Sequence, residues 1–269
     1  MQIKDKVFVV TGGGNGMGRE VVLDLLKRGA KVAAVDLKED GLAETVKLAN
    51  GPKGQLTTHV VNVTDRATVL ALPEKVVKAH GQVDGLLNVA GIIQPFVKIV
   101  DLSFDDIERV MNVNFWGVVN TTKAFLPLLL KRPAAAVLNV SSMGGFLPVP
   151  GQAAYGASKA AVKLFTEALY AETQGTSVAV TVVFPGGVAT NITQNSGVTI
   201  PNMEELMKGK QPKTTSVADA GRIIIDGLEK GAYRVRIGGD AKFMDRFSRL
   251  APRRATLLIA NQMKALLGG

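Results

Sequence analysis

A tyrosine and a lysine lie four positions apart in the alanine-rich segment AAYGASKAA, which covers residues 153–161. Residues with this separation lie on one face of a helix, about one turn apart, so Tyr155 and Lys159 are expected side by side. A cation beside a phenol favours the phenolate and lowers the phenol pKa from its ordinary value of about 10. The pair could therefore take part in proton transfer, although either residue taken alone more often has a structural role.

A glycine-rich turn, TGGGNGMG at residues 11–18, forms a second candidate site. It directly follows an apolar run and opens an amphipathic stretch, which is the context that dinucleotide binding requires. Gly12, Gly16 and Gly18 would let the backbone turn tightly and approach a pyrophosphate at the start of a helix. The second apolar run ends at Asp36, about 20 residues further on, where a carboxylate can accept hydrogen bonds from ribose hydroxyls. A flexible loop remains the alternative for the turn taken alone.

The segments that must position these residues alternate between two kinds. Short, almost continuously apolar runs predict strands covered on both faces, as in a parallel sheet, at residues 6–11, 31–36, 55–63, 83–91, 135–141, 177–186 and 234–238. Longer amphipathic stretches predict helices at residues 19–30, 65–81, 103–130 and around Tyr155. This alternation predicts one doubly wound α/β domain at residues 1–240. A basic amphipathic tail at 241–269 is expected to belong to the same domain or to form a subunit arm.

The composition fits a globular protein with a sizeable core, since 46% of the 269 residues are apolar and 20% are charged. No apolar run approaches the length of a membrane-spanning helix, and the first apolar stretch is too short for a signal peptide. The absence of cysteine excludes disulfides and cysteine-ligated zinc, and it fits a cytoplasmic location. With only His59 and His80, a multi-histidine metal site is excluded, a Ser-His-Asp triad is disfavoured, and no bound metal is expected.

Six motifs occur in a fixed order along the chain: TGGGNGMG, NVAG at 88–91, NVNFWG at 112–117, NVSS at 139–142, YGASK at 155–159 and PGGVAT at 185–190. Together they resemble the short-chain dehydrogenase/reductase family over about residues 5–240. The resemblance implies a single Rossmann domain with a seven-stranded parallel sheet and helices on both faces. It also implies an enzyme that oxidises alcohols or reduces carbonyls with a nicotinamide cofactor, usually as a dimer or tetramer.

The same resemblance implies a set of four catalytic residues. Tyr155 matches the general acid/base, and Lys159 matches the lysine that supplies the cation and binds the nicotinamide ribose. Ser142 matches the serine that orients the substrate oxygen, and Asn114 matches the asparagine that holds a water in the proton relay. Helix packing, a strand end or a loop hydrogen bond could explain each residue singly, but their joint spacing favours the catalytic interpretation.

A second implied set contacts the cofactor. Its members are Gly12, Asn15, Gly16, Met17, Gly18, Asp36, Leu37, Asn62, Val63, Asn88, Ala90, Gly91, Tyr155, Lys159, Pro185, Gly186, Val188 and Thr190. Asn88 is expected to be structural, and a plain Pro-Gly turn is the alternative at 185–186. Two positions depart from the family's pattern: Asn62 stands where relatives usually carry an aspartate near adenine, and Gly187 replaces a larger residue beside the nicotinamide.

The cofactor is expected to be NAD rather than NADP, because a 2′-phosphate would bring negative charge against Asp36. Asn15 supports this preference, since NADP-preferring relatives often carry a basic residue there, whereas Lys38 argues mildly for NADP. Two alternatives stay open: an NADPH-dependent ketoreductase, and a cofactor-binding regulatory protein without turnover.

The expected substrate wall comprises residues 94–97, 143–146, 148–152 and 191–213. Its apolar members and the absence of clustered arginines predict a lipophilic secondary alcohol or ketone, unless these side chains pack together as the core of a lid. The apolar members are Phe96, Phe146, Val149, Ile192, Met203 and Met207.

The tail carries much of the formal net charge of +9, which is compatible with an anionic ligand, a membrane surface or nucleic acid. Phe243, Met244, Phe247 and Leu250 lie at helical spacing, and Leu258, Met263 and Leu266 could form a second apolar stripe. The favoured interpretation is an arm that packs on the body or on a partner subunit. Peripheral membrane contact is the second interpretation, and nucleic-acid binding is disfavoured because no recognised reading module accompanies the charge. Helix 103–130 and the Tyr155 helix carry enough apolar surface to predict a homodimer or homotetramer.

Overall fold

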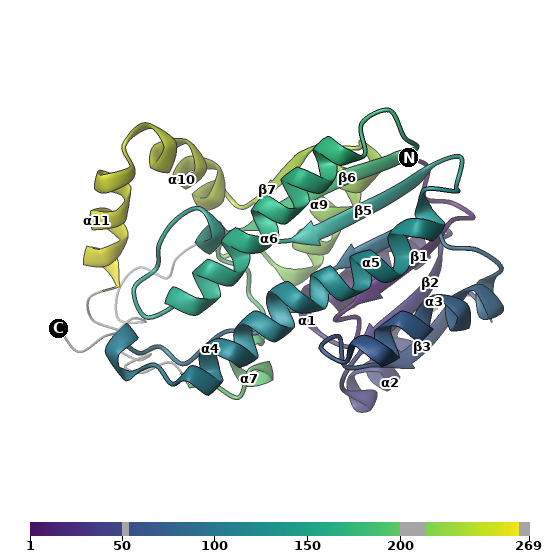
Figure 1. Ribbon diagram of the computed structural model, residues 1–269, viewed down its shortest axis with the longest axis horizontal. Coiled ribbons are helices and arrows are strands. Elements are labelled where there is room, and N and C mark those ends of the chain that lie inside the picture. The colour runs from purple at the N-terminus through teal and green to yellow at the C-terminus, as the bar shows by residue number, and fades with distance from the viewer. Residues whose placement is uncertain (50–53, 200–213, 264–269) are drawn as a thin grey trace.

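A seven-stranded parallel sheet organises the computed structural model, which describes residues 1–49, 54–199 and 214–263. The strand order is β3-β2-β1-β4-β5-β6-β7, and Figure 1 labels every strand of the sheet except β4. The strands are β1 Val7–Thr11, β2 Lys31–Asp36, β3 Leu56–Val60, β4 Gly85–Asn88, β5 Ala135–Val140, β6 Val178–Pro185 and β7 Arg234–Ile237. The predicted doubly wound α/β fold is therefore confirmed. The order reverses between β1 and β4, so the carboxyl ends of these strands open a crevice suited to a ligand.

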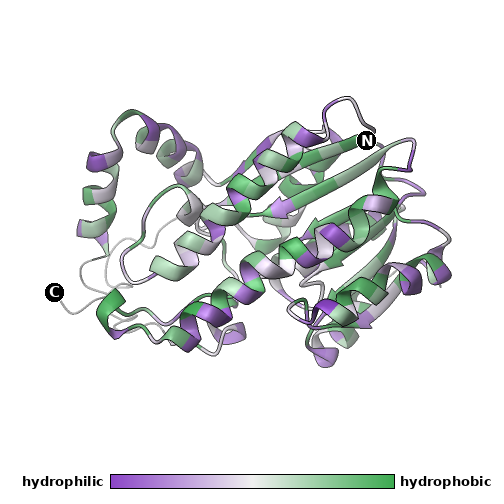
Figure 2. Ribbon diagram, viewed as in Figure 1, coloured by the Kyte–Doolittle hydropathy of each residue, from purple (hydrophilic) through white to green (hydrophobic). Residues whose placement is uncertain are grey.

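Helices cover both faces of the sheet, and the apolar sides of strands and helices meet between the layers (Figure 2). The described helices are α1 Gly16–Lys27, α2 Glu39–Leu48, α3 Arg66–His80, α4 Phe104–Met111, α5 Gly117–Leu129, α6 Ala153–Glu172, α7 Ile192–Asn195, α9 Val217–Glu229, α10 Gly239–Leu250 and α11 Pro252–Gln262. Buried side chains of α1 and α9 pack on one face, and those of α3, α5 and α6 pack on the other. Three of the described helices, α2, α7 and α9, lie in segments for which the sequence patterns predict no helix.

The helix predicted at 103–130 is not regular throughout. A π-helical segment, Asn112–Trp116, separates α4 from α5, and the Gly117 N–H bonds to the Asn112 carbonyl across it. This wider turn contains Asn114, whose side chain is fully buried. The prediction of a continuous α-helix is wrong at this point, and the departure falls on a predicted catalytic residue, as π-bulges often do.

The basic tail forms a helical hairpin, α10 and α11, that packs on the chain's own body. Met244, Ala255 and Ile259 from the hairpin form a buried cluster with Leu147, which lies between two segments expected to line the substrate site. The apolar stripe of α11 is therefore shifted from the predicted one: Leu258 is exposed, Met263 is partly buried on the cluster, and Leu266 lies outside the described residues. In the described part of the chain, no helix is long and apolar enough to cross a membrane.

Candidate active site

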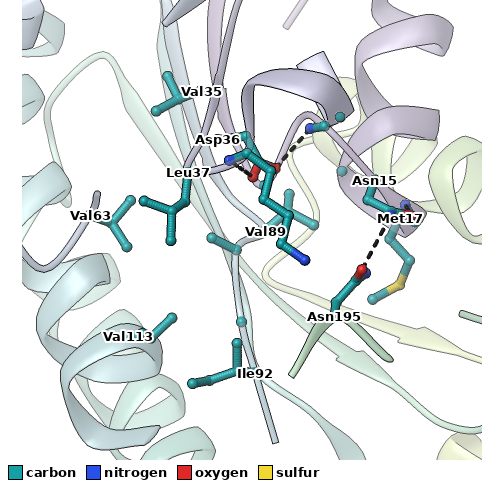
Figure 3. A pocket seen from close by; sticks show the side chains of 18 of the residues that line it. Asn15, Met17, Val35, Asp36, Leu37, Val63, Val89, Ile92, Val113 and Asn195 are labelled. Atoms are coloured by element: carbon teal, nitrogen blue, oxygen red, sulfur yellow. Dashed lines mark hydrogen bonds between the residues drawn. The ribbon is translucent and has the colours of Figure 1, made fainter. Parts of the chain in front are cut away.

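A cleft with about 1090 Å³ of empty space, partly open to solvent, lies beyond the carboxyl ends of β1, β2 and β4. It brings together twelve of the predicted cofactor residues: Gly12, Asn15, Gly16, Met17, Gly18, Asp36, Leu37, Asn62, Val63, Ala90, Gly91 and Thr190. Six predicted contacts do not line the cleft: Asn88, Tyr155, Lys159, Pro185, Gly186 and Val188. Residues that were not predicted as cofactor contacts complete the wall, among them Val113 and Asn195 (Figure 3).

The glycine-rich turn is shaped by close backbone contacts. A Cβ on Gly18 would lie 2.0 Å from the Gly12 carbonyl oxygen, and a Cβ on Gly12 would lie 2.9 Å from the Ala90 Cα. Gly12 also has a φ of +72°, which favours glycine. The glycines thus let the backbone of the turn and the N-terminus of α1 come close to the cleft, so the turn fits a pyrophosphate.

Asp36 occupies the end of β2 at the rim of the cleft. Its carboxylate accepts hydrogen bonds from the Gly14 N–H at 2.9 Å and the Lys38 N–H at 3.0 Å. A carboxylate has about four acceptor positions, so Asp36 retains capacity for ribose hydroxyls. A nearby cation that the sequence reading missed, Arg19, is hydrogen-bonded to the Gly14 and Gly41 carbonyls and to Thr45 Oγ1.

Asn15 joins the glycine-rich turn to a segment on the other side of the cleft. Its Oδ1 accepts from the Gly16 N–H, and its Nδ2 donates to Asn195 Oδ1 at 3.2 Å, a contact visible in Figure 3. Asn195 ends α7, which follows Thr190. Because this bond spans 180 residues, nothing in the local sequence around Asn15 could predict it.

The four predicted catalytic residues converge beside the cleft. A Cβ on Gly91, which lines the cleft, would lie 3.0 Å from Lys159 Nζ and 3.2 Å from Asn114 Oδ1. A Cβ on Gly144 would lie 3.5 Å both from Ser142 Oγ and from the Tyr155 ring. Glycine at these positions lets the polar groups approach each other and the cofactor cleft.

Asn114 bridges two parts of the site. Its Oδ1 accepts from the Ile92 N–H at 2.9 Å, and its Nδ2 donates to the Ile92 carbonyl at 2.9 Å and to Ser158 Oγ at 3.0 Å. The Ser158 hydroxyl in turn donates to the Tyr155 carbonyl at 2.7 Å. The π-helical turn therefore directs an amide that holds the loop after β4 against α6. The water-holding role implied for Asn114 stays a prediction.

Lys159 is buried, with 3% of its surface exposed, and its Nζ donates to the Val140 carbonyl at 3.0 Å. Burial lowers the pKa of the ammonium to about 8, because an apolar surrounding disfavours the charged form. The Nζ atom lies 6.0 Å from the centre of the Tyr155 ring. The expected proximity of the two side chains is thus present.

Burial raises the pKa of the Tyr155 phenol, and a hydrogen bond with Ser142 lowers it by less. This direction is opposite to the one that a neighbouring lysine alone predicts. The reason is that burial removes water from around the phenolate, and this costs more free energy than the hydrogen bond with Ser142 recovers. The phenol is therefore held in its protonated form.

The other predicted contacts have different surroundings. Asn88 Nδ2 donates to Asn139 Oδ1 at 2.8 Å, and Asn88 Oδ1 accepts from Thr121 Oγ1, so its amide ties the sheet to α5. At the end of β6, a Cβ on Gly186 would lie 2.3 Å from the Asp240 carboxylate, which accepts from the Gly187 N–H at 2.7 Å. Asp240, at the start of α10, is a further residue that the sequence reading missed.

The expected substrate wall is partly occupied by the protein itself. Phe146 and Val149 pack against the buried cluster of the hairpin, Phe146 also meets Phe184 with ring centres 5.4 Å apart, and Gln94 is completely buried. Ile192 lines the cofactor cleft. Met203 and Met207 lie outside the described residues.

Comparisons with known proteins show the family to which the chain belongs. The family model for short chain dehydrogenases matches residues 6–200. A Mycobacterium tuberculosis protein described as oxidoreductase SadH is 40% identical over 251 residues, which cover 91% of this chain and 90% of that protein. The 3-oxoacyl-acyl-carrier-protein reductase FabG of Thermotoga maritima is 37% identical over 72% of this chain and 78% of its own length.

Solved structures show the same fold. A short chain dehydrogenase of Burkholderia cenocepacia in complex with NADP is 26% identical, with a TM-score of 0.80 over 96% of this chain and 99% of its own. A short-chain dehydrogenase/reductase of Burkholderia phymatum in complex with NAD, 24% identical, gives a TM-score of 0.81 over 93% of this chain and 96% of its own. The chain belongs to the short-chain dehydrogenase/reductase family and is an NAD(P)-dependent oxidoreductase.

Proposed function

We propose that this protein interconverts a lipophilic secondary alcohol and its ketone, with NAD as the favoured cofactor and Tyr155 as the general acid/base. The observation that carries the proposal is that the Tyr155 phenol is hydrogen-bonded with Ser142 and lies near the buried Lys159 ammonium, which itself lies beside Gly91 on the wall of the cofactor cleft. The bound nicotinamide supplies the hydride acceptor or donor.

The protein's own residues would move the proton and orient the substrate. The phenol donates its proton to the developing alkoxide during reduction and becomes a phenolate, and the phenolate takes the hydroxyl proton of the alcohol during oxidation. The Ser142 hydroxyl orients the substrate oxygen toward that phenol. The buried Lys159 ammonium stabilises the phenolate that reduction leaves behind, and it is within reach of Gly91 on the cleft wall, where it would meet the nicotinamide ribose.

The preference for NAD rests on Asp36. Its carboxylate faces the cleft where a 2′-phosphate would add like charge, and two backbone hydrogen bonds hold it in place. Lys38 supplies the nearest exposed cation at that end of the cleft, and Arg19 is already engaged by three oxygens. An NADPH-dependent ketoreductase is the alternative, and direct comparison of the two cofactors separates them.

A lipophilic substrate is supported by the apolar surroundings of the Tyr155 region, where Met143, Phe146 and Val149 approach the hairpin cluster. The test is to screen the purified protein against secondary alcohols of increasing chain length with NAD, following absorbance of the reduced cofactor. Turnover should rise with chain length. Turnover of sugars or short hydroxy acids alone would contradict the proposed substrate class.

We propose that the protein assembles as a homodimer through the helices next to the site. Phe104, Trp116 and Leu164, on α4, the π-helical turn and α6, expose 82%, 44% and 66% of their surfaces. Burying them against a second copy would remove this apolar area from water. Light scattering at micromolar concentration should give at least the dimer mass, and Leu164→Glu should shift the protein toward the monomer.

The hairpin favours an additional contact with an anionic membrane surface in the cytoplasm. Phe243 and Leu250 are exposed on α10 beside the exposed Lys242, Arg246 and Arg249. Basic residues interleaved with exposed apolar side chains suit anionic headgroups and the acyl boundary beneath them. The wild type should sediment with phosphatidylglycerol vesicles but not with phosphatidylcholine vesicles. The Lys242→Glu/Arg246→Glu variant should no longer bind phosphatidylglycerol vesicles. If this variant instead fails to form the oligomer, the hairpin is an arm that contacts a partner subunit.

A further inference from the structure

The helix that carries Tyr155 begins without a capping side chain of its own. Its N-cap residue, Gln152, makes no capping hydrogen bond with its side chain. The first N–H groups of a helix have no partner within the helix, and at this end Gln152 and Ala154 are buried although Ala153 between them is exposed. Acceptors for these N–H groups must therefore come from elsewhere.

Gln94, about 60 residues earlier in the chain, supplies them. Its Oε1 atom accepts from the Ala154 N–H at 2.7 Å and from the Tyr155 N–H at 3.0 Å. Serine, threonine or aspartate at the N-cap normally accepts from these second and third N–H groups of a helix. The Gln94 side chain has no exposed surface, so this remote cap is shielded from competition by water.

Two further hydrogen bonds lock the same segments together. Gln94 Nε2 donates to the Gly151 carbonyl at 3.1 Å, and Gln152 Nε2 donates to the Gln94 carbonyl at 3.0 Å. The loop that contains Gln94 also contains Ile92, which lines the cofactor cleft and is held by Asn114. A chain of buried and partly buried hydrogen bonds thus runs from the cleft wall to the backbone of Tyr155.

We propose that Gln94 is a positioning residue for the reaction, which fixes the Tyr155 phenol relative to the cofactor cleft through the Tyr155 backbone. The proposal rests on the role given to Tyr155 above. Because the cap is a neutral amide, it also leaves the positive end of the α6 dipole uncompensated next to Tyr155. A carboxylate at the same place would keep both acceptor contacts but would oppose phenolate formation.

Two substitutions separate positioning from folding. Gln94→Glu keeps the acceptor and adds a negative charge, and Gln94→Leu removes the acceptor at similar size. The matched control is Gln82→Leu, which removes the amide that bonds Asp84 and Arg132 at the opposite end of β4. Affinity for NAD and thermal unfolding are measured for all three variants.

The decisive readout is the titration of Tyr155, recorded as near-ultraviolet tyrosinate absorbance. The signal is isolated by subtracting the same protein with Tyr155→Phe, and it needs no substrate. In Gln94→Glu the titration should move to higher pH by about one pH unit. With the best alcohol of the screen, kcat should fall by about tenfold or more in Gln94→Leu, while NAD affinity stays within about twofold, since small displacements of a reacting group cost large factors in rate.

An unchanged Tyr155 titration in Gln94→Glu would overturn the proposal, because a carboxylate held against the Ala154 and Tyr155 N–H groups must disfavour the phenolate. Wild-type kcat in both variants would overturn it as well. If Gln94→Leu does not fold, the titration in Gln94→Glu decides the question. If Tyr155→Phe keeps its activity, the role of Tyr155 fails separately, and that outcome is seen without any Gln94 variant.

Discussion

The cofactor cleft and the Tyr155 region share one edge of the sheet, yet backbone groups shape the first and buried side chains shape the second. The cleft depends on backbone: glycines at 12 and 18 permit close approach, and two N–H groups hold Asp36. The Tyr155 region depends on buried side chains, and Asn114 and Gln94 hold it together through bonds between distant segments. Added bulk should therefore damage the cleft, whereas loss of a single polar atom should damage the Tyr155 region.

Tyr155→Phe tests the Tyr155 region most severely. It removes one hydroxyl without changing bulk, so the fold and NAD binding should persist while kcat falls by about 10²–10⁴-fold, the usual contribution of general acid–base catalysis. Steady-state kinetics and NAD titration measure both effects. Tyr170→Phe, on the same helix, is the control, because Tyr170 packs against Tyr233 with ring centres 4.4 Å apart. Activity within a few-fold of the wild type in Tyr155→Phe would show that the phenol is not the proton donor.

Lys159 should impose a pH dependence on stability. Its pKa falls from 10.5 to about 8 on folding, so the unfolded chain binds the proton more tightly between these values and stability rises with pH there. Below pH 8 the buried ammonium lowers the free energy of unfolding by its full amount, about 3 kcal/mol. Relative to Lys159→Met, the wild type should therefore gain about 2 kcal/mol between pH 7 and about pH 9.5.

Chemical denaturation of wild type and Lys159→Met at the two pH values measures this difference. Lys163→Met, one turn further along α6, serves as the control, because Lys163 forms an ion pair with Glu167 nearer the surface. A difference between wild type and Lys159→Met that does not change with pH would show that the ammonium is not destabilised by burial.

Gly18→Ala tests the cleft by adding one methyl group. The new Cβ would meet the Gly12 carbonyl oxygen at 2.0 Å, so the turn must open. We expect a loss of stability of about 1–3 kcal/mol, as for other overpacked sites, together with weaker NAD binding. Gly239→Ala adds the same group where nothing lies within 4 Å and should leave both unchanged. Normal NAD affinity in Gly18→Ala would refute the close-approach argument.

Asp36→Ala should have the smallest effect and should concern selectivity rather than rate. The wild type is expected to prefer NAD over NADP by at least about tenfold, or about 1.4 kcal/mol. The substitution should shrink this preference by weakening NAD more than NADP. Fluorescence titration with both cofactors measures it, and equal binding by the wild type would overturn the role given to Asp36.

The sequence predicted those parts of the molecule that depend on residues close together in the chain. The apolar runs predicted all seven strands, with β3 and β4 shorter than expected. The glycine turn and Asp36 could be placed at the cleft because strand, turn and helix follow one another directly. The Tyr155–Lys159 spacing predicted their proximity for the same reason.

The remainder depends on contacts between segments far apart in the chain. Gln94 was expected in the substrate wall, but its cap on α6 joins residues 60 positions apart. The raised pKa of Tyr155 follows from burial, which spacing does not reveal. The bonds from Asn15 to Asn195 and from Asp240 to Gly187 are equally non-local. The π-helical turn at Asn114 has no pattern of its own in the sequence.

That wider turn has a consequence for how the chain tolerates changes in length. A residue advances an α-helix by about 100°, and the Gly117–Asn112 bond encloses one residue more than a regular turn does. Deleting one residue between 112 and 116 would restore a regular helix but rotate α4 relative to α5 by about that angle. Because α4 packs on α6 while α5 packs on α3, one of the two interfaces would lose its register. The extra residue in this turn thus sets the rotation of α4 relative to α5, which lets α4 face α6 while α5 faces α3.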